Sequence, residues 1–394
     1  MQVKRRLQSQ LKRMARIFPV VTVTGPRQSG KTTLCKMAFP RANYLSLEDP
    51  ELRAYADQDP RGFIDDHAGK TIIDEVQRVP DLLSSIQVAV DRKKEMGRFI
   101  LTGSANLSLL DTVSQSLAGR TALLTLLPMS FDELKKFPSA PQKLFEALLA
   151  GAYPAIFDRE MAPGEWFASY VGTYIERDVR QLLNIGDRST FQSFLKLCAG
   201  RTGQLLNLSS LGSDCGVVHN TIKAWLSVLE TSYLIHRLPP FFRSVRRRLI
   251  KTPKLHFLDS GLICYLLGIR EVEQLQLHPL RGAVFESWVV SEVLKSLLHR
   301  GREPDAHFFR DRKGHEVDLL LSHPDKLTAV EVKSSRTVAS SFFDELDHFE
   351  QWATTETSVR RVSKVLVYGG ERRQQRKKGE VLPWSLVSTH DWTD

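Results

Sequence analysis

The sequence has little cysteine and no long apolar run. Its four cysteines lie far apart and lack the spacing of metal ligands: Cys35, Cys198, Cys215 and Cys264. We therefore expect reduced thiols and no disulfide framework. No apolar stretch is long enough to cross a bilayer, and the basic start leads into a helical pattern without the apolar core of a signal peptide. These absences predict a cytoplasmic protein with no membrane partner.

Positive charge is what the sequence has in excess. Its 394 residues carry a net charge of +10, with 42% hydrophobic and 25% charged residues. These proportions are typical of a globular protein, and the length allows two or three domains. An excess of basic residues favours an anionic partner, with nucleic acid first, although basic surfaces also serve solubility alone.

A phosphate-binding motif organises the first part of the chain. Residues 18–23 predict a buried strand, and residues 33–38 predict the first turns of a helix. Between them runs a G-x-x-x-x-G-K-T segment: Gly25, Pro26, Arg27, Gln28, Ser29, Gly30, Lys31, Thr32 and Thr33. In this context backbone N–H groups and a helix N-terminus bind phosphate oxygens. We expect Lys31 to reach the β- and γ-phosphates of ATP, and Thr32 to ligate Mg²⁺.

The ends of two later strands supply the other polar groups of such a site. Asp74 and Glu75 follow three β-prone residues, so Asp74 is expected to hold the Mg²⁺ shell and Glu75 to polarise the attacking water. The strand at 98–102 leads to Thr102 and Ser104, which either sense the γ-phosphate or cap the next helix.

Further strands at 43–48 and 121–127 complete the expected sheet. Strands that alternate with helical segments in this way predict a parallel, doubly wound α/β sheet. We assign this P-loop fold to a first domain that spans residues 1–135.

Several motifs together resemble one prokaryotic ATPase family. They are GPRQSGKTTL at 25–34, IDEVQRVP at 73–80, LTGSA at 101–105, and LAGR at 117–120 followed by LPMSFDEL. The family is AAA-type, and its C-terminal half is catalogued as domain of unknown function 4143. The resemblance spans nearly the whole chain and implies ATP binding and ATP hydrolysis. An AAA-type module also makes a homo-oligomer plausible, although no residue states the ring size. Arg120 would supply charge to a γ-phosphate, in cis or across subunits, or it is a surface arginine before a strand.

The middle region, residues 136–275, contains the pattern of a winged helix-turn-helix. Segments 208–216 and 217–226 predict two helices joined at a glycine, and a strand follows them. The second helix of this motif can enter a DNA major groove. The side chains expected to contact DNA are His219, Asn220, Lys223, Arg246, Arg247 and Arg248. The alternative is a winged fold used only for packing or oligomerisation.

The last region, residues 276–394, carries the pattern of a metal-dependent nuclease. A predicted amphipathic helix at 281–294 contains Glu286, and a predicted hairpin contains Asp318. Glu331-x-Lys333 follows thirteen residues later on a strand, where alternation places both side chains on one face. This spacing is that of the PD-(D/E)xK nucleases and predicts a restriction-endonuclease-like α/β domain.

The chemistry suits that arrangement. Glu286, Asp318 and Glu331 are hard oxygen ligands for Mg²⁺ or Mn²⁺, and Lys333 would orient or deprotonate a metal-bound water. Two functions stay open. The chain is an ATP-hydrolysing protein that acts on DNA through a nuclease domain gated by the ATPase. Alternatively, it is an ATP-switched regulatory or scaffold protein, for example a toxin–antitoxin or defence component, with an inactive nuclease fold.

Overall fold

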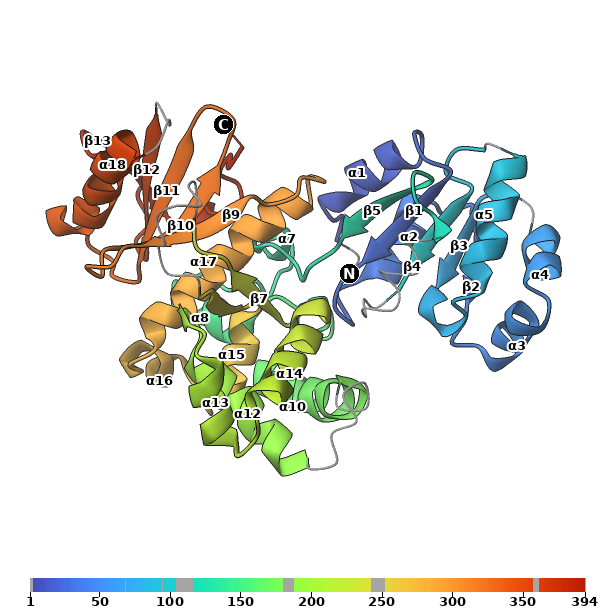
Figure 1. Ribbon diagram of the computed structural model, residues 1–394, viewed down its shortest axis with the longest axis horizontal. Coiled ribbons are helices and arrows are strands. Elements are labelled where there is room, and N and C mark those ends of the chain that lie inside the picture. The colour runs from blue at the N-terminus through green and yellow to red at the C-terminus, as the bar shows by residue number, and fades with distance from the viewer. Residues whose placement is uncertain are drawn as a thin grey trace.

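Three β-sheets and the helices around them make up the computed structural model, which describes residues 3–67, 69–93, 95–103, 116–179, 188–241, 252–356 and 361–393. Figure 1 shows the first sheet on the right, the C-terminal sheet on the left, and the helices of the middle region below and between them.

The first sheet is parallel, as predicted. Its strands, in spatial order, are β2 Asn43–Ser46, β3 Thr71–Asp74, β4 Phe99–Thr102, β1 Val20–Thr24 and β5 Thr121–Thr125. One face is covered by α1 Leu7–Met14 and α2 Lys31–Ala38. The other is covered by α3 Pro50–Gln58, α4 Pro60–Asp66 and α5 Leu82–Arg92, and a short helical turn, η1 Val76–Arg78, follows β3. The doubly wound α/β fold is therefore confirmed.

β1 shows how the sequence produces this layering. All five of its residues are buried, and successive side chains point to opposite faces. Val20 packs into the cluster with α5, whereas Val21 and Val23 pack into the cluster with α2. A central strand covered on both faces is thus continuously β-branched rather than alternately polar.

Helices dominate the middle region. After the first sheet, α7 Phe131–Leu134 leads into it. Its elements are α8 Leu144–Ala150, α9 Pro154–Asp158, α10 Pro163–Tyr170, the π-helical η2 Val171–Val179, α12 Arg188–Gly200, β6 Gln204–Leu205, α13 Leu208–Cys215, α14 His219–Thr231, β7 Ile235–Leu238, β8 Lys254–Phe257, α15 Ser260–Leu266 and α16 Val272–Leu277. β8 lies between β6 and β7 in a small antiparallel sheet. The predicted glycine joint is Gly216, which ends α13 in a left-handed conformation.

A mixed six-stranded sheet forms the C-terminal part, which begins with α17 Arg281–Leu298. The remaining elements are β9 Ala306–Arg310, β10 Glu316–Ser322, β11 Leu327–Lys333, η3 Ser340–Phe343, α18 Asp344–Glu356, β12 Val362–Tyr368, β13 Gln374–Arg376, β14 Gly379–Pro383 and η4 Trp384–Leu386. The spatial order is β13-β14-β12-β11-β10-β9. β9 and β10 form the predicted hairpin, and β11 pairs in parallel with β12.

α17 is not the amphipathic helix that the sequence predicts. It extends to Leu298, and thirteen of its residues are buried. It packs against β11 of the C-terminal sheet and against β8 and α15 of the middle region, and one hydrophobic cluster runs through both parts. Beyond its exposed first residues, Arg281 and Gly282, the helix therefore lies inside a shared core.

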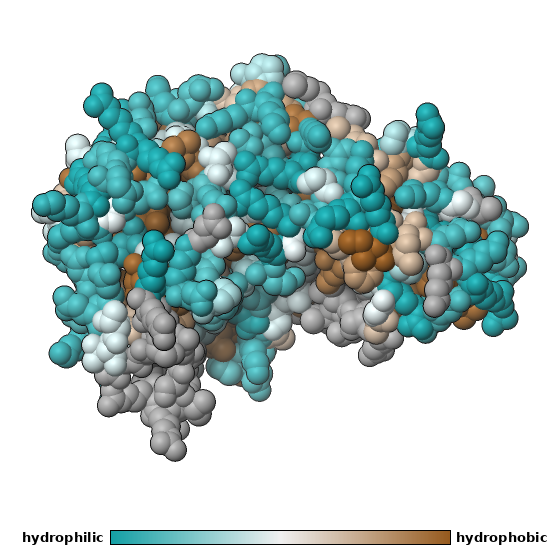
Figure 2. All heavy atoms as spheres, turned by 90° about the horizontal axis from the view of Figure 1, so that it is seen from above, coloured by the Kyte–Doolittle hydropathy of each residue, from teal (hydrophilic) through white to brown (hydrophobic). Residues whose placement is uncertain are grey.

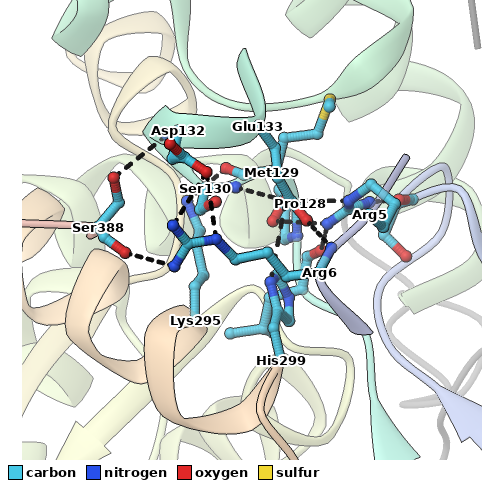
Figure 3. A network of polar contacts seen from close by, with 12 residues as sticks. Arg5, Arg6, Pro128, Met129, Ser130, Asp132, Glu133, Lys295, His299 and Ser388 are labelled. Carbon is cyan, nitrogen blue, oxygen red and sulfur yellow. Dashed lines mark hydrogen bonds and ion pairs between the residues drawn. The ribbon is translucent and has the colours of Figure 1, made fainter. Parts of the chain in front are cut away.

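A buried ion pair joins the first sheet to the end of α17 (Figure 3). Arg5 donates a hydrogen bond to the carbonyl oxygen of Ser29 over 2.7 Å, and its Nε lies 3.0 Å from Oε2 of Glu133. Glu133 is fully buried, and His299, just after α17, lies 3.9 Å from it. Burial alone would raise the pKa of Glu133, but the Arg5 guanidinium holds the pKa of this carboxyl at about 2.

The face shown in Figure 2 is mostly hydrophilic, with hydrophobic residues in separate patches. Exposed large hydrophobic side chains of the described residues are scattered along the chain: Ile17, Tyr44, Val88, Met96, Leu123, Val218 and Leu277. Scattered apolar residues of this kind are ordinary on a protein surface. Within the described part of the chain, no helix combines the length and apolarity needed to cross a bilayer.

We expect Glu133→Gln to destabilise the protein by about 3 kcal/mol at neutral pH, because the Arg5 guanidinium then lies buried without its carboxylate. Folding lowers the pKa of Glu133 from its usual 4.5 to about 2. The stabilisation is therefore complete above about pH 4.5 and is lost as the pH falls toward 2. Urea unfolding of both proteins at neutral pH and near pH 3 should show the difference between them shrinking in acid.

The matched control is Asp132→Asn. Asp132 pairs with Arg6 over 2.9 Å, but both side chains are partly exposed, so its loss should cost less than about 1 kcal/mol. Equal losses from the two substitutions would contradict a special role of the buried pair.

Candidate functional site

The predicted phosphate-binding loop lies where β1 ends and α2 begins, at the carboxyl edge of the parallel sheet. Gly25 has a φ of 143°, and a Cβ there would lie 2.1 Å from the carbonyl oxygen of Leu126, so a side chain is excluded. Gly30 caps α2 with a φ of 93°, which also favours glycine. Ligands of open α/β sheets bind at this edge, facing the helix N-terminus.

Lys31 points its ammonium group into the curve of this loop. Only 7% of the residue is exposed, and Nζ donates hydrogen bonds to the carbonyl oxygens of Gly25 (3.0 Å) and Pro26 (2.8 Å). Burial lowers the pKa of Lys31 to about 8, against the opposing effect of Glu75 and Asp74. The neighbours of the ammonium are neutral carbonyl groups, so an anionic phosphate oxygen would be a stronger partner than any of them.

Asp74 is the centre of the polar groups beside the loop. Thr32 donates a hydrogen bond to its Oδ2 over 2.9 Å, and Thr102 donates one to its Oδ1. Tyr44 of β2 donates to Oδ2 over 2.8 Å, and burial together with this hydrogen bond raises the pKa of Tyr44 to about 12. The structure thus brings together Thr32, Asp74 and Thr102, as the sequence predicts. Tyr44 was missed, because nothing in its local sequence shows that β2 neighbours β3.

Glu75 follows β3 in a left-handed backbone conformation, with a φ of 57°. This conformation is uncommon for a residue other than glycine, and such positions occur often at functional sites. Gln77 donates a hydrogen bond to the Glu75 carboxylate. Glu75 lines the same cavity as Lys31 and Thr32.

That cavity has a volume of about 660 Å³. From the loop it is lined by Arg27, Gln28, Gly30, Lys31, Thr32 and Thr33, whereas Ser29 is fully buried beneath it. The guanidinium of Arg27 lies over the ring of Tyr174 at 5.2 Å. The remaining wall comes from distant segments and includes Val3, Met129, Phe137 and Pro154. The same wall also carries charged residues, among them Arg5, Asp158 and Arg159, and sequence patterns placed none of these residues at the site.

Two predicted residues of the first domain stand apart from the cavity. Ser104 lies outside the described residues. Arg120 immediately precedes β5, at the amino edge of the sheet, where its guanidinium pairs with Asp91 over 2.7 Å. The phosphate-binding loop lies at the opposite, carboxyl edge. The expectation that Arg120 acts in cis is therefore wrong, because parallel strands separate it from the phosphates of its own chain.

The C-terminal sheet brings Asp318, Glu331 and Lys333 together. Lys333 Nζ lies 2.5 Å from Oε1 of Glu331, and the backbone N–H of Val332 donates to Oδ2 of Asp318 over 2.8 Å. The antiparallel pairing of β10 with β11 places the two acids beside each other. Burial and the Asp318 carboxylate raise the pKa of Glu331 well above its ordinary value.

Glu286, from the first turns of α17, completes this carboxylate cluster and meets a lysine that sequence reasoning missed. Lys254 Nζ lies 2.8 Å from Oε1 of Glu286 and 2.5 Å from Oε1 of Glu316. Burial, with Asp318 nearby, raises the pKa of Glu286 to about 8, although Lys254 acts in the opposite direction. In the sequence Lys254 is only a lysine at the start of a strand, and its partners are more than thirty residues away.

α14 presents the three residues predicted to contact DNA. His219, Asn220 and Lys223 are exposed, whereas Ile222 and Trp225 of the same helix are buried. One face of α14 therefore packs against the interior, and the opposite face is exposed. Arg246, Arg247 and Arg248 lie outside the described residues.

A further group of potential metal ligands, Asp311, His315 and His348, lies between the β9–β10 turn and α18. The rings of His315 and His348 stack with centroids 3.8 Å apart. Lone pairs of imidazole nitrogens lie in the ring plane, so stacked rings do not direct them at one ion. Each ring instead has a carboxylate partner, with Asp311 3.2 Å from His348 and Glu345 3.1 Å from His315.

Comparisons with known proteins agree with this architecture. Family descriptions match an AAA domain over residues 18–135, a domain of unknown function (DUF8612) over 141–273, and a domain of unknown function (DUF4143) over 281–387. The uncharacterized proteins Rv2008c of Mycobacterium tuberculosis and Mb2031c of Mycobacterium bovis are each 30% identical over 368 residues, which is 93% of this chain and 80% of the relative.

Similarity to solved structures is weaker. The Walker-type ATPase PABY2304 of Pyrococcus abyssi is 14% identical with a TM-score of 0.43, covering 66% of this chain and 94% of that chain. The RuvB Holliday junction branch migration motor of Thermotoga maritima is 19% identical with a TM-score of 0.31, covering 59% of this chain and 89% of that chain. At these values neither likeness carries a functional argument.

The parallel sheet and its glycine-bracketed loop define the first part of the protein as a P-loop ATPase domain that binds ATP. Because the mycobacterial relatives match along most of both chains, the assignment extends to the whole sequence. The chain belongs to the family of AAA-type ATPases that carry the domain of unknown function DUF4143 at the C-terminal end. The resemblance seen in the sequence motifs is thereby confirmed.

We expect Lys31→Ala to weaken ATP binding at least tenfold, because charged hydrogen bonds to phosphate are worth about 1.5–3 kcal/mol. Glu75→Gln should leave ATP affinity within about threefold and slow hydrolysis by roughly 100-fold or more, because it removes only the carboxylate that is expected to polarise the attacking water. Isothermal titration and phosphate release measure the two effects. The control is Lys36→Ala, which removes a lysine of the same helix whose ammonium lies over the Tyr44 ring. Undiminished ATP affinity in Lys31→Ala would rule out the assigned loop.

Proposed function

We propose that this protein is a Mg²⁺-dependent ATPase that acts on DNA, and that its C-terminal part is a nuclease-like domain coupled to the ATPase. The observation that carries the proposal is that one chain holds two sites suited to phosphate chemistry. One is the loop with Lys31, and the other is the cluster of Asp318, Glu331 and Lys333.

At the ATP site, Thr32 and Asp74 are the residues that would hold Mg²⁺. Their oxygens lie 2.9 Å apart, and hydroxyl and carboxylate oxygens are the ligands that Mg²⁺ prefers. The ion would neutralise charge on the β- and γ-phosphates. Glu75 would orient the attacking water, and Thr102 would report on the γ-phosphate through its hydrogen bond to Asp74.

The middle region supports a DNA-binding role. The order α12-β6-α13-α14-β7-β8, with β8 between the other two strands, is that of a winged helix. In that motif α14 would be the recognition helix, and its exposed residues are His219, Asn220 and Lys223. Arg246, Arg247 and Arg248 would contact backbone phosphates from the connection between β7 and β8.

The carboxylate cluster is suited to a divalent ion. Asp318 and Glu331 would be its ligands, and the ion would be Mg²⁺ or Mn²⁺. Oε2 of Glu331 is buried and has no hydrogen-bond partner among the described residues, so it is available as a ligand. The ion would supply a nucleophilic water at neutral pH, and Lys333 would position that water or stabilise the charge of the phosphate.

A second function is favoured by a different observation. Lys254 already supplies positive charge to Glu286 and Glu316, as expected of a cluster kept for structure rather than cleavage. In that case the protein is an ATP-switched regulatory or scaffold protein, such as a toxin–antitoxin or defence component. The pair Arg5–Glu133 would then relay the state of the loop to α17.

We further propose the domain limits 1–135, 136–275 and 276–394, and a homo-oligomer as the working assembly. The limits are supported by matches that end at residues 135 and 273. An oligomer is the remaining way for Arg120 to approach a γ-phosphate, in this case that of a neighbouring subunit, since its own loop lies at the opposite edge of the sheet.

DNA binding should weaken steeply with salt, because phosphate contacts release counterions. Replacing Arg246, Arg247 and Arg248 by Glu should lower affinity for every sequence and reduce the salt slope by about one for each lost contact. Lys223→Glu should act in the same direction, and Lys12→Glu on α1, also exposed, is the charge-matched control. Fluorescence anisotropy that detects no binding to duplex, fork or single strand at low salt would refute the DNA proposal.

Labelled linear, forked and branched DNA should be cut by the wild type with Mg²⁺ or Mn²⁺, at a rate that depends on ATP. Asp318→Asn should weaken metal binding, whereas Lys333→Ala should keep the metal and abolish cleavage. Asp347→Asn is the matched control, because Asp347 pairs with Lys364 in the same domain outside the cluster. A wild type that cuts none of these substrates would favour the scaffold function. Cleavage that survives both Asp318→Asn and Lys333→Ala would mean that the cleaving site lies outside this cluster.

A further inference from the structure

A buried ammonium group sits among the carboxylates that the nuclease-like site would use. Lys254 is 2% exposed, and its Nζ lies 2.8 Å from Glu286, 2.5 Å from Glu316 and 3.8 Å from Asp318. Although burial alone would lower the pKa of Lys254, these carboxylates raise it well above its ordinary value. A position between several carboxylate oxygens favours a cation, and here that cation is the ammonium group of Lys254.

The backbone that carries this ammonium is fixed. Lys254 begins β8, which pairs with β7 on one side and β6 on the other. The ammonium of Lys254 lies 5.6 Å from the centre of the Phe308 ring. Ser287, the residue after Glu286 on α17, is joined to His256 of the same strand by a 3.0 Å hydrogen bond. Lys254 is therefore a built part of the cluster rather than a side chain that enters from solvent.

The other half of the cluster is differently arranged. Lys333 contacts one oxygen of Glu331, and the Val332 N–H contacts one oxygen of Asp318. The second oxygen of Glu331 is buried without a partner among the described residues, and the second oxygen of Asp318 has only Lys254, at 3.8 Å. Two carboxylate oxygens, one of Asp318 and one of Glu331, are thus left for a ligand that lies between these two residues.

We propose that this cluster holds a single divalent ion between Asp318 and Glu331, and that the Lys254 ammonium replaces a second ion on the Glu286 side. This inference rests on the proposed metal site of the C-terminal domain and deepens it. Glu286 would then be a partner of Lys254, and not a metal ligand as its place in the sequence pattern suggests.

Charge balance supports one ion rather than two. Glu316 has a second cationic partner, since Arg310 lies 3.1 Å from its other oxygen. A bound divalent ion favours the ionised form of the carboxylates around it. With Glu286, Asp318 and Glu331 ionised, the two ammonium groups of the site leave one negative charge. One divalent ion and one phosphate diester would bring the sum to zero. A second divalent ion would leave two uncompensated positive charges in a buried site, which is costly.

The test is a titration of the full-length, nucleotide-free protein with Mn²⁺, followed by electron paramagnetic resonance of the free ion. The wild type should bind one Mn²⁺ that depends on the cluster. Asp318→Asn should weaken it at least tenfold, whereas Glu286→Gln should change its affinity by less than about threefold. Two cluster-dependent ions in the wild type, none at all, or equal losses from the two substitutions would each overturn the proposal.

Removing the ammonium gives the complementary test. Lys254→Met should bind a second Mn²⁺, and the double variant Lys254→Met/Glu286→Gln should lose that second ion. Lys295→Met is the control, because Lys295 is an equally buried lysine paired with Glu292 over 2.8 Å on the same helix. A folded Lys254→Met that still binds one ion would overturn the proposal. If Lys254→Met does not fold, the comparison of Glu286→Gln with Asp318→Asn still decides.

These measurements use neither DNA nor ATP, so they separate this inference from the proposed function. A wild type that binds one Mn²⁺ with the predicted pattern but cuts no DNA would keep the single-ion site and lose the nuclease function. DNA cleavage by a wild type that binds two ions would keep the nuclease function and lose the single-ion site.

Discussion

The buried polar side chains of α17 are the constraint on which the arrangement of the whole chain depends. A helix that is enclosed on most sides must pair its charged groups inside the protein, because an unpaired buried charge is costly. Glu292 accepts a hydrogen bond from the backbone N–H of Phe131 over 2.8 Å, and Lys295 donates one to the carbonyl oxygen of Met129 over 3.1 Å. The helix can therefore be buried only if the segment just after the first sheet lies against it (Figure 3).

The same constraint reaches the ATP site through Arg5. One guanidinium contacts a carbonyl of the phosphate-binding loop and the carboxylate of Glu133, which lies beside His299 at the end of α17. A ligand can shift an equilibrium only through contacts that differ between two states. If ATP binding at the loop shifts the Ser29 carbonyl, it changes a contact of Arg5. Arg5 in turn cannot move away from Glu133 without leaving a buried charge unpaired. The structure thus contains a physical link between the loop and the helix that carries Glu286.

Local patterns predicted the parts of this protein that short stretches of chain determine. The loop from Gly25 to Thr33, the strand that ends at Asp74 and the hairpin that contains Asp318 depend on neighbours in sequence, and all are present. The misses depend on distant pairs. α17 looked amphipathic because serines and charges interrupt its apolar residues, but four of these polar side chains have partners in the interior: Ser287, Ser291, Glu292 and Lys295. The cis role expected for Arg120 failed for the same reason, since its motif does not show at which edge of the sheet it lies.

The two buried lysines of the candidate sites show why one was found and the other missed. Lys31 faces backbone carbonyl groups, and burial lowers its pKa to about 8. Such an ammonium group has no ion-pair partner among the described residues, so it attracts an anion. Its surroundings are a backbone turn with a recognisable sequence. Lys254 faces carboxylates, which raise its pKa, so its positive charge is already paired within the protein. Its setting is created by three elements from different parts of the chain, β8, β10 and α17. The sequence therefore points to the lysine that we expect to bind phosphate, and it gives no sign of the lysine that we propose replaces an ion.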